Sequence, residues 1–114
     1  MADLVARGRD ARSMKLFQLL LPLFDNRGQS FGEESFRKVQ AELTGRFGGL
    51  TAFSRAPAEG LWTSGGKTKR DDILVIEVMA PEVDRAWWQA YREELQRLFR
   101  QDEIIIRVQD IETL

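Results

Sequence analysis

The chain contains neither cysteine nor histidine. Without cysteine it cannot form disulfides, thiolate-ligated zinc or iron–sulfur centres, or a cysteine nucleophile. Without histidine it lacks the axial ligand of most haem sites and the base of a Ser-His-Asp triad. These two absences exclude most of the metal, haem and catalytic sites that short sequence motifs can identify. We therefore expect no cofactor, no metal ligand set and no catalytic residue that the sequence alone can identify.

A strong charge bias and a long apolar run are also missing. The 114 residues carry 17 basic and 18 acidic side chains, which gives a formal net charge of -1. Such a chain creates no net field that attracts nucleic acid or an acidic membrane. Its longest apolar stretch, residues 19–24, is far shorter than the roughly 20 residues of a membrane-spanning helix. We expect neither partner, and the cytoplasm is the default location.

What is present is the composition of one folded domain, with 43% hydrophobic and 31% charged residues. Residues 1–13 contain three arginines and two aspartates, and no apolar segment follows them as in a secretory signal. We expect residues 1–13 to form a disordered leader and residues 14–114 to form a single domain.

Apolar runs predict the strands of this domain. The strongest covers residues 72–79, and others cover residues 15–24, 50–55 and 103–111. Residues 61–64 are expected to continue the second strand after an interruption. The polar residues 65–70 then form a loop before the third strand.

Two stretches have the spacing of amphipathic helices. The first is expected to start at a capping box formed by Ser30 and Glu33 and to end at Gly48. Its buried stripe is Phe36, Val39, Leu43 and Phe47. The second opens at residues 81–84, and its stripe is Val83, Trp87, Tyr91, Leu95 and Leu98. Because Trp87 and Trp88 diverge by about 100° on a helix, one is expected in the core and the other at its margin.

The resulting order, βαββαβ, predicts an α+β ferredoxin-like sandwich: a four-stranded antiparallel sheet with both helices on one face. The expected strand order is 4-1-3-2. Alternate residues of three strands form one wholly apolar set, which we assign to the helix-facing side. This set is Phe17, Leu19 and Leu21, then Leu74, Ile76 and Val78, then Ile104, Ile106 and Val108.

The opposite face is the more informative one, because a solvated face would alternate to polar residues and this one is mostly apolar. Its members are Leu16, Gln18, Leu20, Ile73, Val75, Glu77, Met79, Ile105, Arg107, Gln109 and Ile111. In the expected order Gln18 lies between Glu77 and Arg107. Two interpretations stay open. This polar row fixes the register of a homo-oligomer that associates through its open sheet face, or Gln18, Glu77 and Arg107 contact a small ligand.

Other motifs are weaker. Trp62, near the predicted hairpin, is a fourth candidate ligand contact, since exposed aromatics anchor interfaces or ligands. Residues 60–68 superficially match a phosphate-binding loop, but the first glycine is misplaced and a strand follows instead of a helix. RNA-recognition modules share the topology, yet they stack bases on aromatic residues of strands 1 and 3, where this chain has aliphatic ones.

The stretches Phe47-Gly48-Gly49-Leu50-Thr51 and Gly60-Leu61-Trp62, with the closing residues 101–107, carry a resemblance. Over residues 14–114 the chain resembles a family of small uncharacterised bacterial proteins with a ferredoxin-like fold. The resemblance implies that fold and supplies no catalytic residue. More distantly, the chain is similar to the dimeric α+β barrel superfamily, whose members pair their sheet faces and often hold a ligand. Many enzymes of that superfamily use histidine, which this chain lacks.

A remote alternative concerns Asp25, which follows the first predicted strand. Some ferredoxin-like nucleases keep a metal-binding aspartate at this place. One carboxylate cannot hold a hydrolytic Mg²⁺ ion alone, so a dimer would have to supply a second one. Aspartate before asparagine is also common turn chemistry, which is the simpler interpretation.

Overall fold

The structure is a computed structural model that describes residues 13–55, 63–64, 67–68 and 73–114. The elements in chain order are β1 (Ser13–Pro22), α2 (Glu33–Phe47), β2 (Thr51–Arg55), β3 (Thr63–Ser64), β4 (Lys67–Thr68), β5 (Ile73–Ala80), α3 (Arg85–Leu98) and β6 (Ile105–Glu112). Of the predicted leader, only Ser13 belongs to the described residues. Neither helix in the described part of the chain is long and apolar enough to span a membrane.

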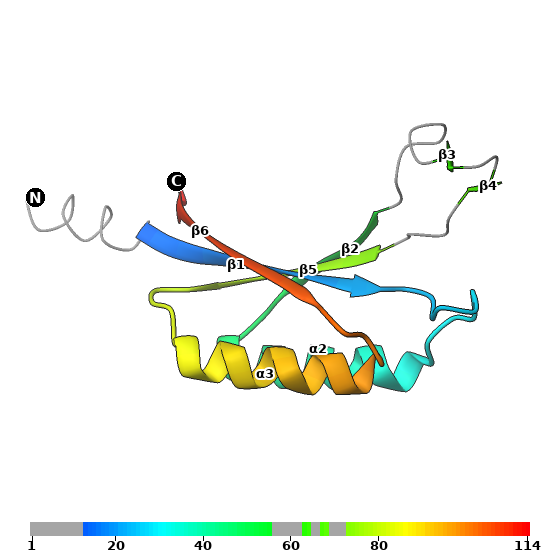
Figure 1. The fold of residues 1–114 in the computed structure, drawn as a ribbon. Coiled ribbons are helices and arrows are strands. Elements are labelled where there is room, and N and C mark those ends of the chain that lie inside the picture. Colours follow the sequence, from blue (N-terminus) through cyan, green and yellow to red (C-terminus); the bar gives the residue numbers. More distant parts are fainter. Residues whose placement is uncertain (1–12, 56–62, 65–66, 69–72) are drawn as a thin grey trace, which may run out of the picture.

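The main sheet has four antiparallel strands in the order β2-β5-β1-β6. Helices α2 and α3 lie side by side on one face of this sheet, as Figure 1 shows. The order is the expected 4-1-3-2 read from the other edge, so the ferredoxin-like prediction is confirmed. β1 is a central strand, with β5 on one side and β6 on the other.

The core lies between this sheet and the two helices. Phe17, Leu19 and Leu21 of β1 are almost completely buried and face the helices. The assignment of the apolar set to this side is confirmed in register, since Phe17 lies opposite Val78 on β5 and opposite Val108 on β6. Val108 nevertheless remains 41% exposed. Its strand pairs only with β1 among the described strands, so the helix layer covers it incompletely.

The start of α2 differs from the expectation. The helix begins at Glu33 with Gly32 as its N-cap, and no side chain caps it. The Ser30 hydroxyl instead donates a hydrogen bond to the carbonyl of Phe31. The predicted capping box is wrong because Glu33 is the first residue of the helix and not the third. The expected end is confirmed: Gly48 has φ 83° and its N–H donates to the carbonyl of Thr44.

Helix α3 is capped by Asp84, whose carboxylate accepts a hydrogen bond from the N–H of Trp87 at 3.1 Å. The tryptophan pair divides as expected, but the core member is Trp88 and not the Trp87 of the predicted stripe. Trp88 is 7% exposed and stacks on Phe17 with a centroid separation of 4.4 Å. Trp87 is half-buried and stacks on Tyr91 at 4.8 Å.

The described residues Thr63–Ser64 and Lys67–Thr68 do not belong to the second strand. Thr63–Ser64 pairs with Lys67–Thr68 in a separate two-stranded sheet, β3-β4. For Thr63 and Ser64 the predicted continuation is wrong, because they pair with their near neighbours in the chain instead of extending β2, which pairs with β5. Residues 61–62 lie outside the described residues. Residues 65–66 between the two short strands lie outside the described residues.

Candidate functional site

A row of polar side chains crosses the sheet on the face opposite the helices. The strand register places Thr51, Glu77, Gln18 and Arg107 side by side on β2, β5, β1 and β6. Side chains in register on one face of an antiparallel pair are close neighbours. The structure therefore brings Gln18 between Glu77 and Arg107, and it adds Thr51 at the end of the row.

Gln18 and Glu77 form a hydrogen-bonded pair. The side-chain Nε2 of Gln18 donates to Oε2 of Glu77 at 2.7 Å, and both residues are half-buried. A hydrogen bond to a carboxylate is stronger than one between two neutral groups. Because an antiparallel ladder holds both backbones, the Glu77 carboxylate is fixed in place on the sheet.

Arg107 differs from the other two predicted site residues. It lies opposite Gln18 on β6 and is exposed. Within the part of the chain that the structure describes, its guanidinium forms neither a hydrogen bond nor a salt bridge. The polar row is thus one bonded pair, Gln18 and Glu77, beside a cation that is available to another group.

Apolar side chains flank this row on both sides. Leu16 and Met79 form the next row toward one end of the strands, and Leu20, Val75 and Phe53 form the next row toward the other end. Phe53 and Met79 are 42% and 46% exposed. An apolar surface of this kind on an otherwise charged protein indicates a contact face.

A hollow of about 360 Å³ opens beside Glu77. Its walls combine the end of the sheet with the segment that follows α2, and they include Leu16, Met79, Ile111, Gly49, Leu50 and Thr51. Glu77 is the ionisable side chain among its lining residues. Gln18 and Arg107 do not line it, so Gln18 acts on the hollow only through the Glu77 carboxylate.

Sequence reasoning missed the Gly49–Thr51 wall. The Phe47-Gly48-Gly49-Leu50-Thr51 stretch predicted a helix end, the start of a strand and a family resemblance, and none of these places it beside Glu77. Its place beside Glu77 follows from the pairing of Thr51 with Glu77 in the β2–β5 register. Trp62, the fourth predicted ligand contact, lies outside the described residues.

Asp25 occupies a tight turn. Its Oδ1 accepts hydrogen bonds from the N–H groups of Arg27 and Gln29 at 2.8 and 2.9 Å, and Arg100 lies 3.8 Å from Oδ2. The bond from Gln29, followed by that from Arg27, lowers the pKa of Asp25 despite partial desolvation. This arrangement supports the turn interpretation. Among the described residues no group of three or more acidic side chains could hold a metal ion.

Comparison with known proteins finds similarity to solved structures and no match in sequence. No protein family matches the chain, and no curated protein matches it. The resemblance to the small bacterial family therefore stays a prediction. Among solved structures, the chain is similar to a phage SAM lyase in complex with S-methyl-5'-thioadenosine. The similarity has a TM-score of 0.53 at 16% sequence identity and covers 88% of this chain and 90% of the lyase chain. The chain therefore shares the overall fold of the phage SAM lyase.

Proposed function

We propose that this protein binds a small organic molecule in the hollow beside Glu77. The observation that carries the proposal is a half-buried carboxylate, fixed by Gln18 at 2.7 Å, at the edge of a hollow of about 360 Å³. Ligand sites commonly combine apolar walls with a few placed polar groups, and this hollow has that composition.

The chemistry of the walls defines the ligand class. A carboxylate accepts hydrogen bonds, so the ligand must present hydroxyl or amine donors, or a cation, to Glu77. Leu16, Met79 and Ile111 require an apolar or thioether portion next to that donor. S-Methyl-5'-thioadenosine has ribose hydroxyls, a methylthio group and a flat base. S-Adenosylmethionine has a sulfonium in place of the thioether and adds an ammonium and a carboxylate. The shared fold with the phage SAM lyase makes these two compounds the first probes.

Isothermal titration calorimetry with S-methyl-5'-thioadenosine and S-adenosylmethionine tests the proposal. We expect Glu77→Gln to weaken binding about tenfold, because one charge-assisted hydrogen bond is lost while the side-chain shape is kept. The matched control is Glu34→Gln, since Glu34 is exposed on α2, away from the hollow. Equal affinities for the wild type and Glu77→Gln would contradict the assignment of the site. Absence of binding by both compounds would exclude this ligand class.

A second candidate function is self-association through the open sheet face. Its support is the exposure of Phe53, Met79 and Ile105, the last of which is 48% exposed on β6. Light scattering at high micromolar concentration should give a mass above that of one chain. Ile105→Lys should shift the mass toward the monomer, whereas a lysine at exposed Gln40 on α2 should not. A strict monomer in the wild-type protein would contradict this proposal and leave the ligand proposal intact.

A further inference from the structure

A second hollow, of about 200 Å³, lies between α3 and the edge strand β6, on the helix side of the sheet. It is separate from the Glu77 hollow, which opens on the other face. Its lining includes Arg85, Gln89 and Arg92 from α3 and Ile106 and Val108 from β6. The described side chains around it therefore place two cations above an apolar floor.

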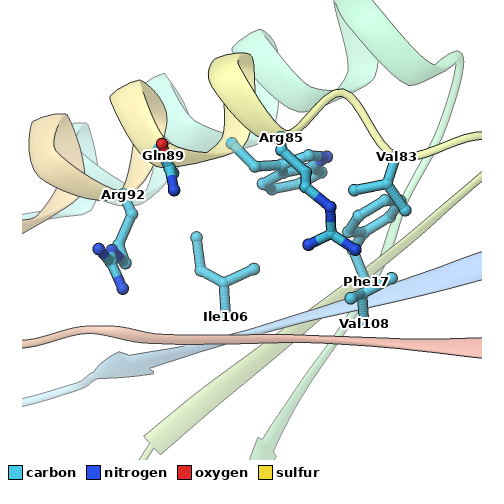
Figure 2. Close-up of a pocket in the computed structure, with 8 residues that line it drawn as sticks. Phe17, Val83, Arg85, Gln89, Arg92, Ile106 and Val108 are labelled. Atoms are coloured by element: carbon cyan, nitrogen blue, oxygen red, sulfur yellow. The ribbon is translucent and has the colours of Figure 1, made fainter.

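The polar groups come from one side of α3. Positions 85, 89 and 92 are spaced by four and three residues, so they share a helix face. Figure 2 shows the side chains of Arg85 and Arg92 extending from α3 toward β6 on either side of Ile106, with Gln89 between them. Two guanidinium groups with an amide between them form a set of hydrogen-bond donors suited to an anion.

The charge of Arg85 and Arg92 is not compensated locally. Within α3 the positions three and four residues from either arginine hold Trp88, Gln89, Leu95 and Gln96, none of which is acidic. Glu82, three residues before Arg85 and ahead of the helix, is exposed and forms no salt bridge with it. On α2, by contrast, Arg37 and Lys38 each pair with a glutamate four positions away, Glu33 and Glu42.

No other carboxylate among the described residues pairs with Arg85 or Arg92. Neither Arg85 nor Arg92 forms a salt bridge or hydrogen bond with any described residue, and no acidic residue lines the hollow. Asp110, two residues beyond Val108 on β6, is already paired with Lys15. The two arginines are therefore available to a ligand from outside the chain.

The floor of the hollow is apolar and accessible. Val108 is 41% exposed and Ile106 is half-buried, and both lie on the helix-facing side of an edge strand. Behind them Phe17 and Trp88 stack on each other at 4.4 Å, which makes the back wall rigid and aromatic. An inorganic anion would use the arginines alone and leave this floor uncovered.

We propose that this hollow binds a small organic anion: a carboxylate or phosphate group joined to a short aliphatic or aromatic body. The charged end lies between Arg85 and Arg92, within reach of the Gln89 amide. The apolar body lies against Ile106 and Val108. The site is independent of the Glu77 hollow, which offers a carboxylate and therefore selects ligands of the opposite character.

NMR titration of the isotope-labelled protein tests the proposal with four probes: octanoate, octyl phosphate, octanol and inorganic phosphate. We expect octanoate or octyl phosphate to perturb the signals of Gln89, Ile106 and Val108. The stronger of the two identifies the preferred anionic group. Octanol and inorganic phosphate should each bind at least about tenfold more weakly, because octanol lacks the anionic group and inorganic phosphate lacks the apolar body. Octanol binding as tightly as both octyl anions would overturn the proposal, as would perturbations confined to Phe53 and Met79.

Two variants separate the site from general charge effects. Arg85→Gln combined with Arg92→Gln should weaken binding of the octyl anion about tenfold or more. Arg37→Gln combined with Arg97→Gln removes the same charge from exposed helical positions outside the hollow and should leave binding unchanged. Equal losses in the two double variants would overturn the proposal.

Val108→Glu tests the same site without removing an arginine. The position is exposed on an edge strand, so the variant is expected to fold. The new carboxylate lies next to the arginines, where it should compete with the ligand and abolish binding. Wild-type affinity in a folded Val108→Glu protein, verified by its NMR spectrum, would contradict the proposed position of the anion.

Discussion

Gln18 and Glu77 are 59 positions apart in the chain, yet the amide of one donates a 2.7 Å hydrogen bond to the carboxylate of the other. The bond crosses from the central strand β1 to its neighbour β5 on the face that the helices leave open. The bond is expected to affect both the stability of the sheet and ligand binding in the hollow, because the Glu77 carboxylate lines that hollow. Its effect on stability can be measured separately from its effect on ligand binding.

Gln18→Leu should lower the free energy of unfolding by about 1–2 kcal/mol, because the half-buried Glu77 carboxylate loses its donor. Replacing both residues, as in Gln18→Leu with Glu77→Leu, should recover most of that loss, since no charge is then left unpaired. Urea denaturation of the two single variants and the double variant measures the coupling. Additive effects of the two substitutions would show that the bond contributes nothing.

The position of Trp88 at the centre of the aromatic core predicts a large cost for its removal. Trp88→Ala should destabilise the protein by about 3–5 kcal/mol, since it leaves a cavity between Phe17 and Phe47. Trp87→Ala should cost less, about 1–2 kcal/mol, because Trp87 is half-buried and loses mainly its contacts with Tyr91 and Arg46. Urea denaturation of both variants gives the comparison. A larger loss for Trp87→Ala would contradict the assignment of the core member.

Two glycines at the end of α2 predict opposite effects of the same substitution. Gly48 has φ 83°, so Gly48→Ala should destabilise the protein by about 1 kcal/mol or more. Gly45 lies inside the helix and an added Cβ meets nothing within 4 Å, so Gly45→Ala should stabilise it by about 0.5–1 kcal/mol. Thermal unfolding of the two variants should therefore give melting temperatures on either side of the wild-type value.

The turn at Asp25 predicts a pH-dependent contribution to stability. The N–H groups of Gln29 and Arg27 lower the pKa of Asp25 below its ordinary value of 3.8. A carboxylate with a lowered pKa stabilises the folded state at pH values above the ordinary pKa, and this contribution disappears as the pH falls through the lowered value. Asp25→Ala should therefore have a lower melting temperature than the wild type at pH 6.

At a pH below the lowered pKa, the difference between Asp25→Ala and the wild type should shrink. Melting curves of both proteins from pH 6 to pH 2 measure it. Glu34→Gln, at an exposed helix position, controls for the general effect of acid. A difference that is independent of pH would show that the ionised carboxylate does not contribute to the turn.

The alternation of apolar residues was enough to predict the fold and the polar row. Residue parity and strand order place Gln18, Glu77 and Arg107 on one face of adjacent strands once β1 is central, and the structure gives the register that sets Gln18 opposite both. The Gly49–Leu50 wall could not be predicted, since its position depends on the path of the connection between α2 and β2. The predicted stripe named Trp87 because it was counted in steps of four from Val83, which precedes the helix; Trp88, three residues before Tyr91, fits the same face and is the buried one.

The hollow between α3 and β6 was missed for a different reason. Arg85 and Arg92 fit an ordinary solvated helix face, and only the folded structure shows that β6 presents Ile106 and Val108 beneath them. A weak signal did exist in the sequence. Arg92 lacks an acidic residue three or four positions away on either side, whereas Arg37, Lys38, Arg46 and Arg97 each have one.

The central place of β1 affects the order of events during synthesis. Of the described strands β1 leaves the ribosome first, but one of its partners, β5, begins at Ile73 and the other, β6, at Ile105. Phe17, Leu19 and Leu21 therefore lack their sheet partners until more than half of the chain has been made. Pairing across such separations is slow to form, and it makes folding of the sheet a late, concerted step. Among the described strands, β1 therefore stays unpaired longest in the nascent chain, and a chaperone would be expected to bind it first.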